Sequence, residues 1–392
     1  MRNIGIENDE RIIAGQFMDS FYPAYDGVTV CMDNYAKYLA LKDGAFVVAS
    51  KYKGFVDTSP YDVYRLNGIQ IPGLQYKFIL PNFNRHTIRD IKQRELDICH
   101  SHSPFMAGKI AVDVARTKGI PIVSTFHTQF KSEFYKYTHN NFITNQFVDM
   151  VIRYYNRVDE VWAVNQNSAD VLAGYGYKKD IFIMHNGTDL HYPDDAASKI
   201  KRIKDKHNLT NEEIFLFVGR LTLLKNIDLS IKALQLYRHT GKKFKFFVVG
   251  YGDDESKLKK MVSDMNMDDC VVFVGKITDR DWMTGYYLAS DLFLFPSEYD
   301  NDPLVKKEAA ACRTPSILVR GSNSAYDILE NENGYLIDNT TPESMFEKIT
   351  SVMSNRARLQ EVSLNAERTI AMPWAKVVDK AYERYGDVIK AY

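Results

Sequence analysis

The chain has 392 residues, of which 45% are hydrophobic, and its 50 Lys and Arg residues balance 50 Asp and Glu residues. A chain of this length exceeds one ordinary core, so we expect two domains of about 150–200 residues each. The formal net charge of zero argues against a nucleic-acid-binding protein and against a polybasic membrane anchor.

Cysteine usage and hydropathy limit the class of protein further. The four cysteines are scattered without a Cys-x-x-Cys pair, which argues against a disulfide scaffold and fits a reducing cytosol. The first ten residues lack the apolar stretch of a signal peptide, and no apolar run approaches the ~18 residues of a membrane span. We therefore expect a cytoplasmic protein, with peripheral contact at the inner face of a membrane left open.

Short apolar runs alternate with amphipathic segments in the first half of the chain, a pattern typical of βα units around a parallel sheet. The expected strands are residues 11–17, 45–50, 98–100, 121–125, 160–164 and 181–185. The expected helices are residues 30–41, 105–118, 141–155 and 166–174.

The second half of the chain repeats this pattern after a polar, Lys-rich stretch at residues 189–213, which we interpret as a linker. Met372-Pro373 is expected to end a helix, because proline has no N–H and restricts its predecessor. The expected strands are residues 214–218, 245–249, 270–274, 291–295 and 316–319, and the expected helices are 226–239, 256–266, 279–289, 305–312, 342–354 and 374–392.

These patterns predict an α/β protein with two Rossmann-like, doubly wound domains. The expected boundaries are residues 1–190 and 191–372, followed by a C-terminal helix at 373–392. Doubly wound sheets bind ligands at the carboxyl ends of their strands, so we expect one cleft between the two domains.

The most informative segment is Phe-Pro-Ser-Glu-Tyr-Asp-Asn-Asp-Pro-Leu-Val-Lys-Lys-Glu at residues 295–308, which follows an expected strand. It places two carboxylates, Asp300 and Glu308, around the start of a helix. One carboxylate can accept hydrogen bonds from ribose hydroxyls and the other from sugar hydroxyls, while backbone N–H groups between them face phosphates. The segment favours a protein that binds a sugar nucleotide.

Two other interpretations of this segment stay open. Asp300-Asn-Asp302 fits the D-x-D sequence with which some transferases hold a metal ion, although its position late in a second α/β domain argues against that role. Asp300 and Glu308 are alternatively a solvated pair on a charged helix, because Lys306 and Lys307 lie beside them.

Cations are expected at the first βα turn of the second domain. The sequence Phe-Val-Gly-Arg-Leu-Thr-Leu-Leu-Lys-Asn at residues 217–226 places Arg220 and Lys225 there, with Asn226 as a candidate helix cap. Two fixed cations can stabilise a diphosphate leaving group. Solvated surface charges are the simpler explanation for this motif alone, but the carboxylate segment downstream favours an anion site.

Glycines follow three expected strands of this domain. Gly219 and Gly250 allow a backbone to approach a ligand closely, although a plain tight turn explains Val-Gly-Tyr-Gly-Asp-Asp at 249–254 equally well. Lys276 follows the third glycine, where the backbone has the position to bond a base edge.

In the first half, Gly27 lies in a loop between a strand and a helix, where it can touch a phosphate or an acceptor. His100, His102 and His127 end two strands. Three histidines can hold zinc, but these lack the i, i+4 spacing or a cysteine partner, so we expect no metal site and assign His127 to the transferred sugar. The chain has no G-x-x-x-x-G-K-[ST] and no G-x-S-x-G motif, which leaves kinase-type NTPases and serine hydrolases without support.

From Gly15 to the terminal helix, the chain resembles the retaining glycosyltransferases of family 4, also called group 1, which have the GT-B fold. The family pattern Pro-Ser-x-x-Glu-Gly-Phe-Gly-Leu-x-x-x-Glu-Ala is similar to residues 296–309. The resemblance implies that Glu308 binds the ribose, Asp300 holds the sugar, Arg220 and Lys225 grip the diphosphate, and His127 lies near the sugar's C6 hydroxyl. It also implies that the last helix crosses back onto the first domain.

The chain departs from the family pattern at three places. Asp300 replaces a glutamate, and Asp26 stands where the first of two glycines is usual. Asp302-Pro303 replaces Phe-Gly and removes one backbone N–H.

The expected activity is metal-independent, retaining transfer of a hexose from a nucleotide diphosphate sugar, preferably a UDP-hexose, to the hydroxyl of a glycan, lipid or other acceptor, without a cofactor. The alternatives are a sugar-nucleotide epimerase or a phosphorylase on the same fold, and an inactive nucleotide-sugar-binding scaffold. Residues 126–137 mix aromatics with lysines, which fits a lipid-headgroup surface or a helix packed on the sheet. The expected catalytic residues are Arg220, Lys225, His127 and Asp300, and the expected nucleotide- and sugar-binding residues are Gly27, Gly219, Gly250, Lys276, Asn301, Asp302, Pro303, Leu304 and Glu308.

Overall fold

A computed structural model describes residues 11–70 and 77–392 of the chain. The chain divides into two compact units. The first unit ends at His185 but also includes Trp374–Tyr392, and the second unit runs from Asn186 to Pro373. The expected boundary at residue 190 lies a few residues beyond this division.

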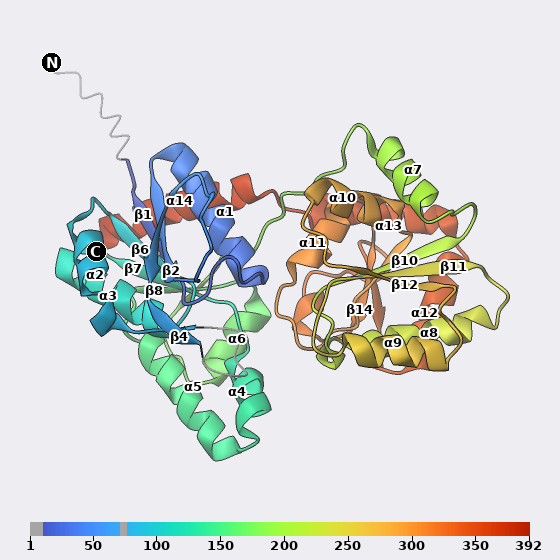
Figure 1. Cartoon of the computed structure of the whole chain (residues 1–392), viewed down its shortest axis with the longest axis horizontal. Helices are drawn as coiled ribbons and strands as arrows, with labels where there is room; N and C mark the ends of the chain where they lie inside the picture. The colour runs from blue at the N-terminus through green and yellow to red at the C-terminus, as the bar shows by residue number, and fades with distance from the viewer. Residues whose placement is uncertain (1–10, 71–76) are drawn as a thin grey trace. The chain divides into compact units, whose positions relative to one another are not determined.

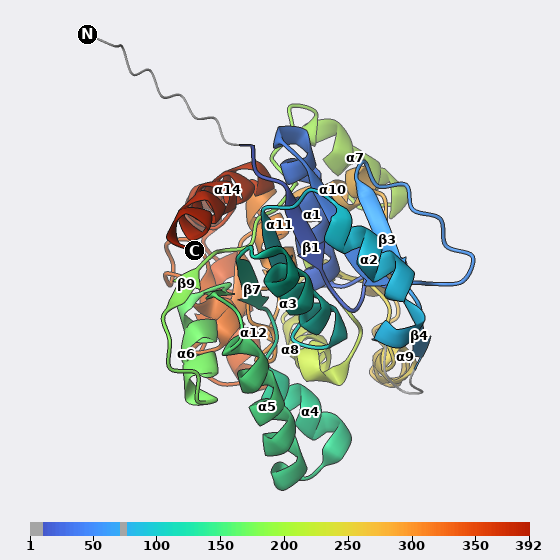
Figure 2. The same cartoon turned by 90° about the vertical axis from the view of Figure 1, so that its left-hand side faces the viewer.

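The first unit is built on a parallel sheet with the strand order β3-β2-β1-β6-β7-β8-β9 (Figure 2). Its inner strands are apolar and buried, as continuous hydrophobic runs predict for strands covered on both faces. The strand order reverses between β1 and β6, where a doubly wound sheet opens a crevice for ligands. The strands are β1 (Ala14–Phe17), β2 (Ala45–Ser50), β3 (Asp62–Leu66), β6 (Ile98–Ser101), β7 (Ile122–Phe126), β8 (Glu160–Ala163) and β9 (Ile181–Ile183).

Three helices of the first unit, α1, α5 and α6, begin at a residue whose side chain caps them. Asp26 and Asn165 each accept a hydrogen bond from a backbone N–H three residues ahead, at the starts of α1 and α6. An antiparallel pair, β4 (Gly68–Gln70) and β5 (Lys77–Ile79), lies outside the main sheet. The helices are α1 (Gly27–Lys42), η1 (Pro81–Phe83), α2 (Arg85–Gln93), α3 (Met106–Lys118), α4 (Phe130–Thr138), α5 (Asn141–Tyr155), α6 (Gln166–Gly174) and α14 (Trp374–Ala391).

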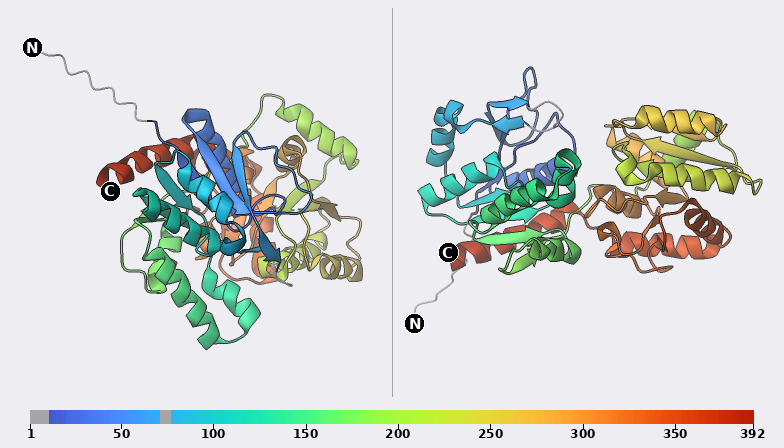
Figure 3. Two further views of the ribbon diagram at one scale, coloured as in Figure 1. Left: turned by 60° about the vertical axis from the view of Figure 1, so that its left-hand side comes forward. Right: turned by 90° about the horizontal axis from the view of Figure 1, so that it is seen from below.

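The terminal helix α14 packs on the first unit although it follows the second unit in sequence (Figure 3). Trp374 is buried beside the ring of Tyr35 of α1, and Asp379 forms an ion pair of 2.8 Å with Lys42 of the same helix. Tyr385 stacks on Trp162 of β8 with a ring separation of 5.3 Å. These contacts anchor the end of the chain to the first sheet.

The second unit holds another parallel sheet, with the strand order β12-β11-β10-β13-β14-β15. Figure 1 shows α8, α9 and α12 on one face of this sheet and α10, α11 and α13 on the other. The order reverses between β10 and β13, so the ligand crevice is expected beyond the ends of these two strands. The strands are β10 (Glu213–Val218), β11 (Phe244–Val249), β12 (Val271–Gly275), β13 (Leu292–Leu294), β14 (Ser316–Val319) and β15 (Tyr335–Ile337), and the helices are α7 (Ala196–Lys206), η2 (Leu223–Lys225), α8 (Ile227–Arg238), α9 (Glu255–Asp264), α10 (Arg280–Ala289), α11 (Leu304–Ala311), η3 (Asn323–Ala325), α12 (Pro342–Met353) and α13 (Arg356–Thr369).

The expected linker is instead part of the second unit, so that interpretation was wrong. Helix α7 packs along α10, and Ile203 of α7 is fully buried between them. Asp281 of α10 pairs with Lys199 and with Arg202 of α7, the latter at 2.6 Å. The lysines that made this segment resemble a solvated linker form the outer face of an amphipathic helix.

Candidate functional site

The loops that leave β10 and β13 lie beside one another where the strand order of the second sheet reverses. The loop after β10 carries Arg220 and Lys225, and the loop after β13 carries Asp300. The amino group of Lys225 lies 2.7 Å from both carboxylate oxygens of Asp300, and this pair ties the two loops together. Ser297 donates a further hydrogen bond of 2.6 Å to Asp300. The predicted cation and the predicted sugar-binding carboxylate are therefore direct neighbours.

Arg220 is half-buried on the same loop as Lys225. Within residues 11–70 and 77–392, no side chain or carbonyl forms a hydrogen bond or ion pair with its guanidinium group. A half-buried guanidinium without a counterion has five N–H donors to offer to an anionic ligand.

Helix α11 begins at the end of the loop that contains Asp300. Pro303 is its N-cap and provides no side-chain cap hydrogen bond. Nothing among the described residues accepts from the first two backbone N–H groups of the helix, those of Leu304 and Val305. Asn301, earlier in the loop, is buried and its side-chain oxygen accepts from Asn323 at 3.0 Å. The loop thus presents unpaired N–H groups at the positive end of a helix, a favourable place for a phosphate.

Asn226 is the N-cap of α8, but its side chain forms no cap hydrogen bond and donates to the carbonyl of Pro296 at 2.9 Å. The prediction of a side-chain cap at Asn226 was therefore wrong. The asparagine joins the loop after β10 to the loop after β13 instead, and its backbone φ of 53° lies in the left-handed region rather than in the extended region typical of side-chain caps.

Asp302 belongs to a buried group of charges beneath this loop. Its carboxylate lies 3.4 Å from the amino group of Lys307 and 3.8 Å from that of Lys306. Lys306 also donates to the carbonyl of Ser324 at 2.8 Å and pairs with Asp327 at 2.5 Å. Both lysines are buried, so the interpretation of a solvated, charged helix face was wrong: four charges neutralise one another inside the protein instead.

Glu308 of α11 is held in a second cluster of charges. Arg280 donates to one carboxylate oxygen at 2.9 Å, and Tyr287 donates to the other at 2.8 Å. Arg280 also pairs with Asp189. Burial alone would lower the pKa of Arg280, but the carboxylates of Glu308 and Asp189 outweigh it and raise this pKa above its usual range. The sequence patterns did not point to Arg280, because it comes from a different βα unit than its partner.

The glycines after β10 and β11 allow two turns to pack backbone against backbone. A Cβ atom on Gly250, whose φ is +136°, would lie 1.9 Å from the carbonyl oxygen of Gly219. A Cβ atom on Gly252 would lie 2.3 Å from the carbonyl oxygen of Leu221. The side chain of Lys276 is exposed and its amino group lies 5.3 Å from the centre of the Tyr251 ring. The geometry therefore gives Gly250 a packing requirement of its own, beside any contact with a ligand.

In the first unit, Gly27 is the first residue of α1 and is exposed. The preceding Asp26 accepts a hydrogen bond of 2.7 Å from the N–H of Thr29. The aspartate that replaces a family glycine is therefore the N-cap of this helix.

His100, His102 and His127 lie close together at the carboxyl ends of β6 and β7 in the first unit. His100 contacts the hydroxyls of Tyr385 and Thr125 at 2.6 and 2.7 Å. Nδ1 of His102 lies 3.0 Å from Nε2 of His127. Burial lowers the pKa of His127 to about 3 and holds the pKa of His102 well below its usual value, so both rings are neutral at pH 7.

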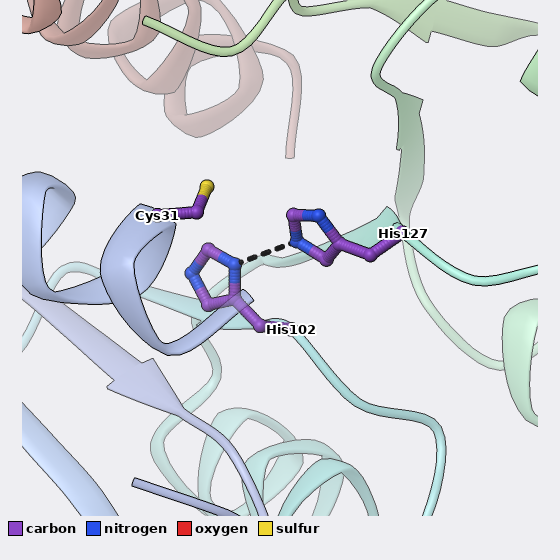
Figure 4. A group of neighbouring side chains, drawn as sticks. All are labelled: Cys31, His102 and His127. Carbon is purple, nitrogen blue, oxygen red and sulfur yellow. Dashed lines mark hydrogen bonds between the residues drawn. The ribbon is translucent and has the colours of Figure 1, made fainter. Parts of the chain in front are cut away.

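One neighbour of these histidines was missed from the sequence. Figure 4 shows Cys31 of α1 beside His102 and His127, and the ligand atoms of the three side chains lie within 4.8 Å of one another. The three residues are far apart in the sequence. They lie close together because the start of α1 and the carboxyl ends of the neighbouring strands β6 and β7 are at the same end of the sheet.

Helices α4 and α5 form a hairpin that extends away from the first sheet (Figure 2). Its base is anchored by Phe130, which is buried against Phe105 and Phe126. Its outer side chains include several large exposed hydrophobic groups, of which Phe142 is 73% exposed. None of the helices in the described part of the chain is long and apolar enough to cross a membrane. The exposed group, which we call the hairpin patch, consists of Tyr135, Tyr137, Phe142, Ile143 and Phe147.

Comparison with known proteins identifies both halves of the chain. The family model "Glycosyltransferase Family 4" matches residues 25–192, and the model "Glycosyl transferases group 1" matches residues 199–369. Among curated proteins, the alpha-monoglucosyldiacylglycerol synthase of Acholeplasma laidlawii is 25% identical over 385 residues, which cover 93% of this chain and 94% of that protein. The synthase of the same name from Streptococcus pneumoniae is 25% identical over 315 residues, 77% of this chain and 70% of that protein.

Solved structures give the same fold. Anabaena HepE in complex with UDP-glucose superimposes with a TM-score of 0.79 at 16% identity, covering 96% of this chain and 100% of that chain. Sucrose-phosphate synthase from Thermosynechococcus elongatus gives a TM-score of 0.79 at 18% identity, with 97% and 100% covered. These similarities confirm the expected α/β architecture of two Rossmann-like domains and the GT-B fold.

Proposed function

Because the chain belongs to the group 1 and family 4 glycosyltransferases of the GT-B fold, we propose that it transfers a hexose from UDP-hexose to a lipid-linked hydroxyl with retention and without a metal ion. The class of enzyme follows from the family. The donor, the stereochemistry, the independence from metal and the acceptor are the content of the proposal.

The observation that carries the proposal is the pairing of Lys225 with Asp300 at the crevice of the second sheet. In this position, a diphosphate can take the ammonium as a counterion while the carboxylate turns to sugar hydroxyls. Arg220 and the free N–H groups at the start of α11 add further donors for the same phosphates. The positive charge that other enzymes obtain from a divalent cation is thus present in side chains and a helix terminus, which supports metal independence.

The carboxylates in and near the D-x-D sequence also support this view. Asp300 pairs with Lys225, and Asp302 lies beside Lys306 and Lys307 in the interior. Carboxylates that already neutralise lysines are poor ligands for a magnesium or manganese ion, since binding would leave the buried ammonium groups unpaired.

Glu308 is oriented to accept hydrogen bonds from a ribose. Arg280 and Tyr287 hold its two oxygens, yet each carboxylate oxygen has lone pairs left for a hydroxyl donor. A fixed carboxylate gives up little conformational entropy on binding, which makes it an effective anchor for the nucleoside.

The transfer itself needs no protein nucleophile. The acceptor oxygen forms a bond to C1 of the sugar on the face from which the diphosphate leaves, and the bond between C1 and the β-phosphate oxygen breaks. The acceptor proton passes to that phosphate oxygen, so the products are UDP and the retained glycoside. Lys225 and Arg220 stabilise the negative charge that develops on the diphosphate, and His127 positions the sugar through a hydroxyl contact.

The acceptor is assigned from the hairpin patch. A protruding helical hairpin with exposed Tyr, Phe and Ile side chains suits the interface of a bilayer, where aromatic rings lie at headgroup level. The two relatives named as alpha-monoglucosyldiacylglycerol synthases make a diacylglycerol lipid the first acceptor to test. Peripheral contact through this patch would bring the first unit to its acceptor.

The test combines donor binding with product analysis. UDP and UDP-hexoses are expected to raise the melting temperature, equally with and without EDTA, because a ligand that binds only the folded state stabilises it by mass action. With vesicles that contain diacylglycerol, the UDP-hexose that raises the melting temperature is expected to yield an α-linked glycolipid and UDP.

Four outcomes would overturn parts of this proposal. A β-linked product refutes retention, and loss of turnover in EDTA that is restored by a divalent cation refutes metal independence. Donor consumption without acceptor, with a new sugar nucleotide formed, identifies an epimerase. Binding of UDP-sugar without turnover on lipid or soluble acceptors identifies an inactive scaffold.

A further inference from the structure

We propose that Cys31, His102 and His127 form a binding site for a borderline transition-metal cation, with Zn²⁺ as the reference ion. The three side chains come from the first turns of α1 and from the carboxyl ends of β6 and β7. One thiolate and two imidazoles are the donor set that zinc prefers over magnesium or calcium. We call this group the Cys-His-His site.

The geometry requires only a small rearrangement. With Zn–N bonds of about 2.0–2.1 Å and a Zn–S bond of about 2.3 Å, tetrahedral ligands lie roughly 3.3–3.6 Å apart. The nitrogens of His102 and His127 that face one another are 3.0 Å apart, and all three ligand atoms fall within 4.8 Å. A metal ion would take the place of the proton between the two rings, that proton would move to Nδ1 of His127 so that the ring stays neutral, and Cys31 would release its thiol proton to solvent.

The surroundings of His102 orient it as metal ligands are oriented. Its other ring nitrogen, Nε2, lies 2.8 Å from the side-chain oxygen of Gln16, which can only accept, so Nε2 carries the proton and Nδ1 is left with a lone pair. Metal-ligating histidines almost always donate their second N–H to such an acceptor. His100 is not part of the site, because both of its ring nitrogens contact hydroxyl groups.

Three protein ligands leave one coordination position open. Cys31 and His102 are buried whereas His127 is only partly buried, so the open position is expected on the His127 side. This arrangement has the ligand count of an exchangeable site rather than a closed structural one. A bound cation would also remove His127 from any contact with the sugar, so the site is expected to inhibit transfer, and this consequence alone rests on the proposed function.

The direct test is a titration of the full-length, reduced protein with Co²⁺, a spectroscopic substitute for Zn²⁺, followed by competition with Zn²⁺. The wild-type protein is expected to bind one equivalent, with the visible bands of a tetrahedral ion and a thiolate-to-metal charge-transfer band. Cys31→Ser is expected to lose the charge-transfer band and to bind at least ~10-fold more weakly. Gln16→Ala is expected to weaken binding by roughly 10–100-fold, as loss of an outer-shell partner does.

The matched control is Cys99→Ala, which removes another buried cysteine of the same unit that lies on β6 outside the site. Its spectrum and affinity are expected to equal those of the wild type. Melting temperatures of all variants establish that each is folded, and a Cys31→Ser protein that fails to fold is replaced by His102→Gln, for which the same loss of affinity is expected.

Two results would overturn the site: no stoichiometric Co²⁺ binding to the folded wild-type protein, or an unchanged spectrum and affinity in Cys31→Ser. A separate assay of transfer is expected to show inhibition by Zn²⁺ that EDTA reverses. A protein that binds Co²⁺ through Cys31 but transfers no sugar would refute the proposed function and leave the metal site standing.

Discussion

Substitution of Lys306 tests whether the buried charges beneath the loop after β13 form a charged network. The substitution Lys306→Met keeps the apolar stem of the side chain and removes only the charge and its hydrogen bonds. Lys306 is fully buried, bonds the carbonyl of Ser324 at 2.8 Å and pairs with Asp327 at 2.5 Å. Removing it would leave the two carboxylates of Asp302 and Asp327 with Lys307 as the one remaining cation of the cluster.

The expected cost follows from the burial of this pair. Burial lowers the pKa of Lys306, whereas Lys306 and Lys307 outweigh burial to lower the pKa of Asp327, so the carboxylate of Asp327 is ionised at pH 7 and lies 2.5 Å from the amino group of Lys306. Loss of one partner of a buried pair costs ~3–5 kcal/mol, and because Lys307 still compensates part of the remaining negative charge, we expect the lower end of this range. With a urea m-value of ~1–3 kcal/mol/M, a loss of 3 kcal/mol lowers the midpoint by roughly 1–3 M. Since a lowered carboxylate pKa stabilises only above its unfolded value, the contribution of Asp327 is expected to fade as the pH falls below ~4.

The assay is urea unfolding at pH 7 followed by circular dichroism, with hydrogen exchange to assign the transition to the second unit. Lys232→Met is the matched control, since Lys232 forms a half-exposed pair of 2.8 Å with Asp228 on α8 and its loss is expected to cost under ~1 kcal/mol. Lys306→Met/Asp327→Asn is expected to recover part of the lost stability, because it no longer buries that lone carboxylate. A loss below ~1 kcal/mol in Lys306→Met would refute the reasoning that this cluster is a charged, desolvated network.

Three further substitutions probe other parts of the molecule. Gly250→Ala is expected to destabilise the second unit by ~2–3 kcal/mol in urea unfolding, because the new Cβ would lie 1.9 Å from a carbonyl oxygen at a φ of +136°. Gly174→Ala is the control and is expected to cost nothing, because a Cβ there has no atom within 4 Å. Equal urea unfolding curves for the Gly250→Ala and wild-type proteins would refute the packing role of Gly250. Tyr287→Phe is expected to weaken UDP binding by roughly 10-fold in calorimetry, since it removes the 2.8 Å hydrogen bond that orients Glu308; unchanged affinity would separate that carboxylate from the nucleotide. Burial raises the pKa of Asp19 from 3.8 to about 6, so the folded state favours its protonated form. The free energy of unfolding is therefore expected to fall by ~3 kcal/mol as the pH rises from ~4 to ~6. Asp19→Asn is expected to remove this pH dependence, and a variant whose stability falls with pH in parallel with the wild type would contradict the assignment.

Local sequence patterns predicted most strands of both sheets, because parallel strands covered on two faces are continuous apolar runs. Strand β2 and helices α5 and α6 have the expected bounds. Strands β3 and β15 were not predicted. The Asp-Val-Tyr-Arg-Leu sequence of β3 lies at the edge of the sheet and is only partly buried, and the apolar run of β15 is only three residues long. Such short or edge strands lack the longer apolar run that marks the inner ones.

The candidate donor site was predicted as a set of motifs, but its pairings were not. That Lys225 contacts Asp300, and that Arg280 holds Glu308, depends on loops that leave different strands and meet at the sheet edge. For Asp302, the position in the sequence suggests a contact with the ligand, whereas in the structure its carboxylate is enclosed with two buried lysines.

The sequence by itself determined the class of fold, the order of the βα units and the residues that follow each strand, because hydrophobic periodicity, glycines and prolines act over a few positions. Only the tertiary structure decided which of these residues meet. Cys31, His102 and His127 lie in three different βα units, and the reversal of strand order in the first sheet brings them within 4.8 Å of one another. Crossover connections place distant segments side by side, so the chemistry of a doubly wound protein is set by its strand order as much as by its motifs.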